Sequence, residues 1–265
     1  MKAIAFKVRL NSLYSIRIPF TWQSALTYPV LPPSAVIGMF ANALQRYKND
    51  RNPVAYLNLV EENIIWAGSR LLTPCLIKSY TTSAITKWED HIGAKFTNAL
   101  GRQFAFTKTL EIAGIFKDDT LINELVEALI TSPLTCGDSE SAISLESKPE
   151  DMKKEVEKVD DLESIVTHYP FPFSNDVKIS EGKGLLYLMH ERCKPSERNF
   201  PLTLYLVPIE EKERILFPTS VTIQIVKKNS ESPKEVFKIQ DIGYVLKSQF
   251  KIEEPKAKIK KRKKN

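Results

Sequence analysis

The chain has 265 residues, of which 43% are hydrophobic and 26% are charged, a composition typical of a globular protein with a buried core. Lys2, Lys7, Arg9 and Arg17 interrupt the N-terminal stretch, which therefore lacks the unbroken apolar region of a signal peptide or a membrane span. We expect a cytoplasmic protein without a membrane partner.

The net charge of +6 comes from the C-terminal end of the chain. Residues 256–265 contain seven lysines and arginines and no acidic residue, so the rest of the chain is close to neutral. Such a basic block suits a polyanion such as nucleic acid, or it serves as a disordered, solubilising tail.

The cysteines Cys75, Cys136 and Cys193 are odd in number, widely spaced and never part of a Cys-x-x-Cys motif. This pattern argues against a disulfide framework and against a structural zinc site. We expect small, buried apolar side chains at these positions.

Residues 2–10 alternate apolar side chains with others, which predicts a strand with one buried face. Further on, Pro32 and Pro33 precede Ser34, which predicts a helix with Ser34 as its N-cap. Gly38 lies inside this helix, where glycine is less favourable than alanine by about 1 kcal/mol. Its presence favours a close approach of a ligand or of another backbone. Alternatively, the prolines only set the packing of the helix on the sheet.

Residues 64–80 and 104–116 are rich in β-branched and aromatic types and are predicted to be paired strands. Residues 81–103, between them, are too long for a tight turn. Such an insert is either a functional protrusion or a flexible segment.

Asp118 or Asp119 is predicted to cap a second helix with one apolar stripe, and residues 140–147 are predicted to form a fourth strand. The order β, α, β, β, α, β over residues 1–147 is that of an α+β, ferredoxin-like (RRM-like) domain. In this fold, two helices cover one face of an antiparallel sheet.

The second half of the chain is predicted to be smaller and rich in strands. Residues 148–168 are expected to form a charged linker or a solvated helix, residues 169–252 a β-rich subdomain that begins with a rigid turn, and residues 253–265 a basic disordered tail. Short strands are expected at residues 184–190, 200–208, 219–226 and 242–250.

Three features of the sequence resemble the CRISPR-associated Cas-five family, part of the RAMP superfamily of RNA-binding proteins. The first is the segment that contains Tyr28, Pro29, Pro32, Pro33, Ser34 and Gly38. The second is its position, about twenty residues after an N-terminal strand. The third is residues 128–147, where a helix and a proline precede a Gly-x-Ser-x-Ser motif and a strand, although Asp138 stands where a basic residue is expected.

The resemblance implies a non-catalytic subunit of a type I CRISPR (Cascade) effector complex, a ribonucleoprotein of antiviral defence, with an archaeal type I-A complex preferred. Such a subunit binds the 5′ handle of the CRISPR RNA (crRNA) and caps a filament of Cas-seven backbone subunits. Its other partners are a Cas-eight large subunit and, indirectly, target DNA and a helicase-nuclease.

The resemblance also implies that the hairpin insert folds over the guide RNA as a thumb. Cations and aromatic rings together suit single-stranded RNA, although Trp88 equally suits a protein–protein contact. The expected RNA-binding residues are Lys87, Trp88, His91, Lys95, Phe96 and Arg102 in the thumb, Tyr28, Ser34, Gly38, Ser139 and Ser141 in the family motifs, and Lys183.

Lys183 lies between two glycines, in a turn that either offers backbone N–H groups to a phosphate or simply connects two strands of a hairpin. No nucleotide-binding or metal-binding motif is present, so neither a cofactor nor a metal ion is expected.

The competing class is a metal-independent endoribonuclease that processes CRISPR precursor RNA. Its candidate proton shuttle is His91, which has Lys87 and Lys95 as basic neighbours. The equivalent subunit of a type III complex is the alternative among RNA-binding subunits.

Overall fold

The computed structural model describes residues 1–21, 24–89, 93–138, 141–160, 164–193, 202–225 and 234–248, and only the backbone of residues 82–89 and 93–100. His91, Ser139 and the predicted basic tail at residues 253–265 lie outside the described residues.

The central sheet is built around the N-terminal strand. Strand β1 (Lys2–Leu10) pairs antiparallel with β6 (Thr109–Phe116), and β3 (Ile64–Leu71) pairs with the other edge of β6. This confirms the predicted pairing of the two strand regions around the insert. The remaining strands of this sheet are β7 (Leu134–Thr135), β8 (Ala142–Leu145), β9 (Lys153–Val159), β18 (Lys234–Ile239) and β19 (Gly243–Ser248).

The other edge of β1 is shared between two strands. Residues Val8–Leu10 pair with β8, and residues Lys2–Ile4 pair with β9, which in turn pairs with β18. The expectation of a linker or solvated helix at residues 148–168 is therefore wrong. The 3-10 helix η1 (Pro149–Asp151), β9 and β10 (Ser164–Thr167) lie in this range. Charged side chains of β9 point to solvent, while its backbone is held between two strands distant in sequence.

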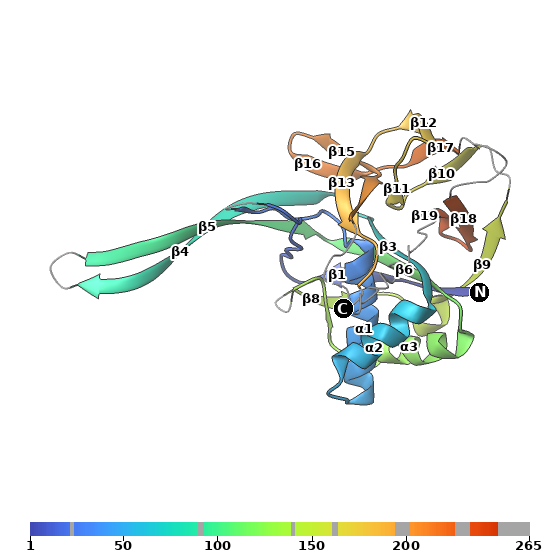
Figure 1. Cartoon of the computed structure of the whole chain (residues 1–265), viewed down its shortest axis with the longest axis horizontal. Coiled ribbons are helices and arrows are strands. Elements are labelled where there is room, and N and C mark those ends of the chain that lie inside the picture. The colour runs from blue at the N-terminus through green and yellow to red at the C-terminus, as the bar shows by residue number, and fades with distance from the viewer. Residues whose placement is uncertain are drawn as a thin grey trace, which may run out of the picture.

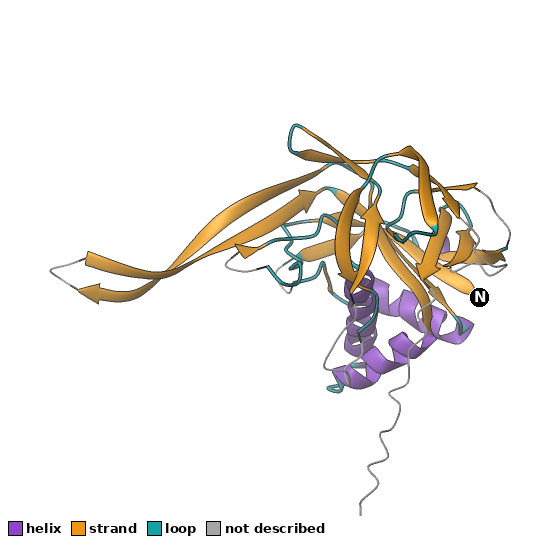
Figure 2. Ribbon diagram, turned by 45° about the horizontal axis from the view of Figure 1, so that its top comes forward, coloured by secondary structure: helices purple, strands orange, loops and turns teal. Residues whose placement is uncertain are grey.

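The helices α1 (Pro33–Lys48), α2 (Pro53–Asn63) and α3 (Asp119–Thr131) gather on one side of the molecule (Figure 2). Asp118 caps α3 by accepting a hydrogen bond from the Thr120 N–H at 2.8 Å, as predicted. Helix α1 begins at Pro33, with Pro32 at the N-cap position, so the expectation that Ser34 caps it is wrong. The sequence analysis did not anticipate α2.

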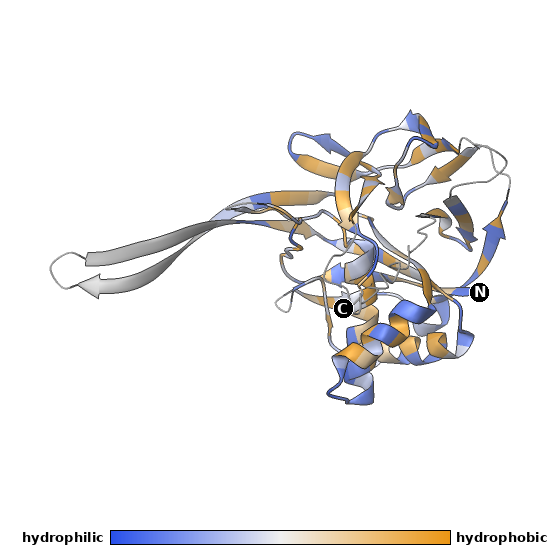
Figure 3. Ribbon diagram, viewed as in Figure 1, coloured by the Kyte–Doolittle hydropathy of each residue, from blue (hydrophilic) through white to orange (hydrophobic). Residues whose placement is uncertain are grey.

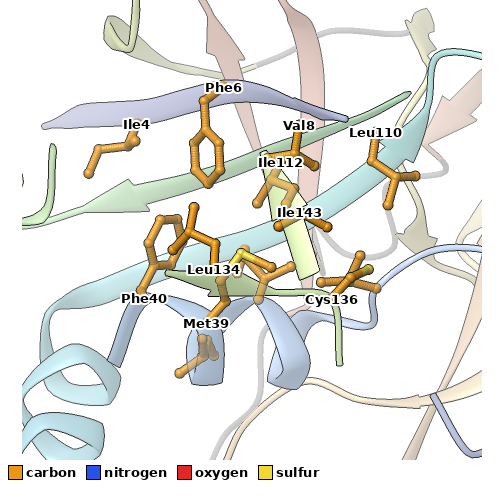
Figure 4. Packing of buried hydrophobic residues seen from close by; sticks show 14 of the residues in the cluster. Ile4, Phe6, Val8, Met39, Phe40, Leu110, Ile112, Leu134, Cys136 and Ile143 are labelled. Atoms are coloured by element: carbon orange, nitrogen blue, oxygen red, sulfur yellow. The ribbon is translucent and has the colours of Figure 1, made fainter. Parts of the chain in front are cut away.

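Alternation along β1 divides its side chains between two apolar clusters. Ile4, Phe6 and Val8 pack toward α1 and α3 (Figure 4), and Ala3 and Ala5 pack toward the C-terminal strands. Aromatic rings form the centre of the helix side. The Phe40 ring lies edge-on to Phe6 and Phe116, with centroids 6.1 and 5.3 Å away.

The C-terminal half adds two three-stranded sheets (Figure 1). One contains β10, β17 (Val221–Ile225) and β12 (Val177–Gly182), and the other contains β11 (Phe171–Pro172), β14 (Leu202–Val207) and β13 (Leu185–His190). The expected short strands correspond to β13, β14, β17 and β19. The expected rigid turn spans residues 169–173, and two of its five residues, Phe171 and Pro172, form strand β11. This strand lies at an edge of its sheet, a position that tolerates proline.

The two halves share a core, because Met189, Tyr205 and Leu216 belong to the same apolar cluster as Phe6. Cys75 and Cys136 are buried in that cluster, as expected, and Cys193 is half-buried; all are free. Within the described ranges, no helix is long and apolar enough to cross a bilayer.

Two glycines offer a matched test of the packing. A Cβ added at Gly114 would lie 2.9 Å from the Phe40 ring, whereas one added at Gly38 would meet no atom of the described residues within 4 Å. We expect Gly114→Ala to lower the free energy of unfolding by about 1–3 kcal/mol and Gly38→Ala to raise it by about 0.5–1 kcal/mol. Urea denaturation of both variants checks this, and equal stabilities would contradict the packing.

Candidate functional site

A long β-hairpin projects from the body of the protein (Figure 1). It consists of β4 (Cys75–Glu89) and β5 (Gly93–Thr107), so it extends beyond the predicted insert at both ends. Its base belongs to a five-stranded sheet whose other strands are β15 (Ile209–Lys212), β16 (Ile215–Pro218) and β2 (Ser24–Ala25). Apart from the short pairings with β2 and β16 and a bridge between Ala105 and Tyr14, the two arms pair with each other in the described backbone.

Thr73 and Thr107 form the junction where the strands leave the central sheet and become the hairpin. The backbone N–H groups of Lys108 and Thr109 donate to Thr73 Oγ1 at 3.1 and 2.9 Å. The Thr107 hydroxyl donates to the Thr73 carbonyl at 3.0 Å, and the two hydroxyl oxygens lie 2.8 Å apart. Because N–H groups at a bend lack ladder partners, these bonds fix the bend and the direction of the hairpin.

The two faces of the hairpin base differ in their surroundings. Cys75, Ala105 and Thr107 lie on the inner face and are 0% exposed. The opposite side, which we call the outer face, faces solvent. The outer face consists of Leu76, Lys78, Tyr80, Arg102, Phe104 and Phe106, which stand opposite one another in the register Leu76–Phe106, Lys78–Phe104 and Tyr80–Arg102.

Three of the six residues of the outer face are aromatic, and along the hairpin base hydrophobic and hydrophilic residues are interspersed (Figure 3). Tyr80 is 49% exposed and Phe106 is 47% exposed. The Tyr80 and Phe104 rings meet edge-on, with centroids 5.7 Å apart, and the Arg102 guanidinium lies 4.7 Å from the centre of the Phe104 ring. Solvent-facing positions of an antiparallel sheet are normally polar, so this surface calls for a ligand or a partner.

Arg102 joins the hairpin to the Gly-x-Ser-x-Ser segment. Its Nε donates to Ser15 Oγ at 3.1 Å, and its Nη2 forms an ion pair with Asp138 Oδ2 at 3.0 Å. The Asp138 carboxylate also accepts a hydrogen bond from Ser141. The structure therefore brings two predicted residues, Arg102 and Ser141, to one place, but both already have partners within the chain.

Lys78 differs from Arg102 in having an unpaired charge. Its side chain is exposed, and no carboxylate in the described part of the chain forms an ion pair with it. It is the outer-face cation available to an anionic ligand without breaking an existing bond.

The proline segment is buried rather than exposed. Tyr28 is 2% exposed, its hydroxyl donates to the Leu188 carbonyl, and burial raises its pKa to about 12. Tyr14 donates to the Pro29 carbonyl at 2.5 Å, and Leu31 N–H donates to Ser69 at 2.8 Å. The side chains of Tyr28 and Ser141 are therefore buried within the chain, and their expected role as RNA contacts stays a prediction.

Ser34 and Gly38 lie in the first turns of α1. Ser34 is half-buried, and its carbonyl accepts a hydrogen bond from the Cys193 thiol at 3.2 Å. Gly38 faces open space, so nothing within the described chain requires a glycine there.

Lys183 is exposed and donates to the Glu210 carboxylate at 2.7 Å. Hydrogen bonds from Lys183 and Lys212 lower the pKa of Glu210 to about 2. The turn is not a hairpin connection, because β12 and β13 pair with different strands. Its glycines are explained by packing: a Cβ at Gly182 would lie 2.4 Å from the Ser220 carbonyl oxygen, and φ is +93°.

The distal thumb residues are described only by their register. Lys87 lies opposite Lys95, and Trp88 lies opposite Ala94. Phe96 lies opposite Ile85. Their role in RNA binding stays a prediction.

Sequence reasoning missed Lys78, Tyr80, Phe104 and Phe106. Their signal was the alternation in "LIKSY" and "FAF", which was assigned to ordinary strand pairing. Among the described residues, no group of three potential metal ligands occurs. The His168 Nδ1 atom lies 3.4 Å from the Thr219 carbonyl oxygen.

Comparisons with known proteins agree with the resemblance seen in the sequence. Residues 4–132 match the family model described as "CRISPR-associated protein (Cas_Cas5)". The matched residues are therefore similar to this CRISPR-associated family, called Cas-five above. No curated protein sequence matches the chain.

The fold is similar to that of solved CRISPR proteins. The crystal structure of a CRISPR protein from Archaeoglobus fulgidus has a TM-score of 0.60 at 15% identity, over 94% of this chain and 99% of that chain. A chain of the Type III-B Cmr-beta complex bound to cognate target RNA and AMPPnP has a TM-score of 0.49 at 11% identity, over 82% of this chain and 86% of that chain. A chain of a CRISPR RNA-guided surveillance complex has a TM-score of 0.44 at 12% identity, over 87% of this chain and 95% of that chain.

The threonine junction can be tested with an isosteric substitution. Thr73→Val removes the acceptor of the Lys108 and Thr109 N–H groups, so we expect the free energy of unfolding to fall by about 1–3 kcal/mol. Thr81→Val, at an exposed position of β4, should change it by less than about 0.5 kcal/mol. Urea denaturation compares the two, and equal stabilities would show that the junction does not stabilise the bend.

Proposed function

We propose that the protein is a non-catalytic, RNA-binding subunit of a type I CRISPR effector complex. It binds the 5′ handle of the CRISPR RNA and caps the filament of Cas-seven backbone subunits, next to a Cas-eight large subunit. The proposal extends the similarity of residues 4–132 to the Cas-five family into a role for the whole chain.

The observation that carries the proposal is the projecting β4–β5 hairpin with its aromatic and cationic base. A two-stranded ribbon is at best marginally stable alone in water, so a projecting one is best understood as an element that closes on a partner. Exposed rings beside an unpaired lysine suit unpaired bases and the phosphates between them.

The proposed fold behind this role is the ferredoxin-like arrangement. Strands β8, β1, β6 and β3 are neighbours in this order, and α1 and α3 pack on the side of Ile4 and Phe6. The chain order β1, α1, β3, β6, α3, β8 then fits the βαββαβ pattern, with α2 and the hairpin as insertions. We retain residues 1–147 as the RNA-binding domain and residues 169–252 as a second, β-rich part.

The test removes the hairpin without disturbing the body. Thr81 and Gly101 are cross-strand partners, so residues 82–100 can be replaced by Asn-Gly, a dipeptide that closes a two-residue hairpin turn. We expect the affinity for a 5′-handle RNA to fall at least tenfold, because the expected distal contacts Lys87, Trp88 and Phe96 are removed. Fluorescence anisotropy measures the affinity, and the thermal unfolding midpoint confirms that the body is intact.

Unchanged handle affinity in the shortened variant would contradict the proposal. A variant without residues 256–265 is the control for non-specific charge: if the tail touches RNA, the salt dependence of binding flattens in this variant alone. The endoribonuclease alternative is examined by incubating the full chain with repeat RNA in EDTA. Site-specific cleavage lost in His91→Ala would replace the non-catalytic assignment.

A further inference from the structure

The outer face has no structural reason to be aromatic. The inner face of the same sheet already packs into the main core through Cys75 and Ala105. Tyr80 and Phe106 each leave nearly half of their surface in water, which is unfavourable by about 25 cal/mol for each Å² of apolar area. In the isolated chain these rings stabilise little, so their function lies in an interaction with another molecule.

The exposed rings stand in line along the ribbon. Phe106 is opposite Leu76, and Tyr80 is four residues beyond Leu76 on the same strand. The two rings are therefore separated by about 13 Å, at about 3.3 Å for each residue. Lys78 lies midway between them, opposite Phe104, so the order along the surface is ring, cation, ring.

The charges around this line favour an anionic ligand. Lys78 carries an unpaired positive charge, while the nearby carboxylates of Asp138 and Glu210 are held by Arg102, Lys183 and Lys212. A protein partner would need an acidic, apolar surface to match. A single strand of RNA supplies flat π faces and phosphates in alternation, which is the pattern of the outer face.

Resting on the proposed function, we propose that the outer face is a stacking platform for unpaired RNA bases. One base stacks on Tyr80 and another on Phe106, and Lys78 neutralises a phosphate between them. Arg102 is a positioning residue: its guanidinium covers Phe104 and its ion pair with Asp138 holds it there, which keeps the Phe104 ring edge-on to Tyr80.

The experiment compares two fluorescein-labelled strands of equal length bound to the full chain: a 5′-handle RNA and an abasic strand with the same sugar–phosphate backbone. Stacking predicts that Tyr80→Ala and Phe106→Ala each weaken binding of the RNA by about tenfold and leave the abasic strand unaffected. Tyr47→Ala, which removes a 37% exposed ring from α1, is the matched control and should change neither affinity.

Three further variants separate stacking from folding and from charge. Tyr80→Phe and Phe106→Tyr keep an aromatic ring and should retain near-normal RNA affinity. A purely structural defect would instead lower the affinity without regard to whether the ring is kept. Lys78→Gln should reduce the slope of log affinity against log salt by about 0.7 for both strands, as expected for one lost phosphate contact.

The platform is refuted if Tyr80→Ala and Phe106→Ala bind handle RNA with wild-type affinity. It is also refuted if they lose as much affinity for the abasic strand as for the handle RNA. It is also refuted if these variants lose affinity only for an RNA-free backbone subunit, because the outer face is then a protein interface. In these cases the hairpin-shortening experiment still decides the proposed function. If the wild type itself fails to bind handle RNA, both proposals fail.

Discussion

The bend held by Thr73 and Thr107 determines how the rest of the hairpin is presented. Strands β3 and β6 run on through this junction into β4 and β5, and the threonine hydroxyl groups replace the ladder bonds that the bend removes. Once the bend is fixed, successive side chains along each strand point to opposite faces of the ribbon. Cys75 and Ala105 therefore face the core, while Lys78 and Phe106 face outward. A shift of one residue in this register would bury Lys78 and expose the inner side chains, so the aromatic outer face depends on the junction.

The Arg102–Asp138 ion pair explains a departure from the family pattern. An acidic residue after Gly137 looked unsuited to a phosphate site, and the structure shows that it serves the hairpin instead. Gly137 itself has a φ of +85°, and a Cβ there would lie 2.3 Å from the Ile16 side chain, so the loop needs glycine to approach residues Ser15 and Ile16. Because Arg102 is about one-third exposed and Asp138 one-fifth exposed, the pair is partly screened by solvent, and its contribution is more to geometry than to stability.

The sequence predicted those elements whose signals are local. The alternation in residues 2–10 and the cap at Asp118 required no knowledge of distant parts, and both were confirmed. Strand β9 was missed because its charged side chains resemble those of a linker, and only pairing with β1 and β18 makes it a strand. Helix α2 was missed because Val60 is its only buried residue, although Asn52 and Pro53 carry the signals of a helix start. The outer face was missed for a related reason, since exposure of Tyr80 depends on which strands cover it.

The proline segment and the glycine after it have separate physical causes, although they adjoin in sequence. The prolines lead a buried crossing in which Tyr14, Tyr28 and Ser69 satisfy the polar groups, so stiffness there reduces the conformational entropy lost when the core forms. Gly38 has no comparable reason, because its missing side chain leaves open space and α1 would gain stability from alanine. Within the described residues, Gly38 relieves no clash, so the packing of this part of the chain does not explain the glycine. The prolines therefore stabilise the fold itself, whereas the close approach of a ligand or another backbone at Gly38 stays a prediction from the sequence.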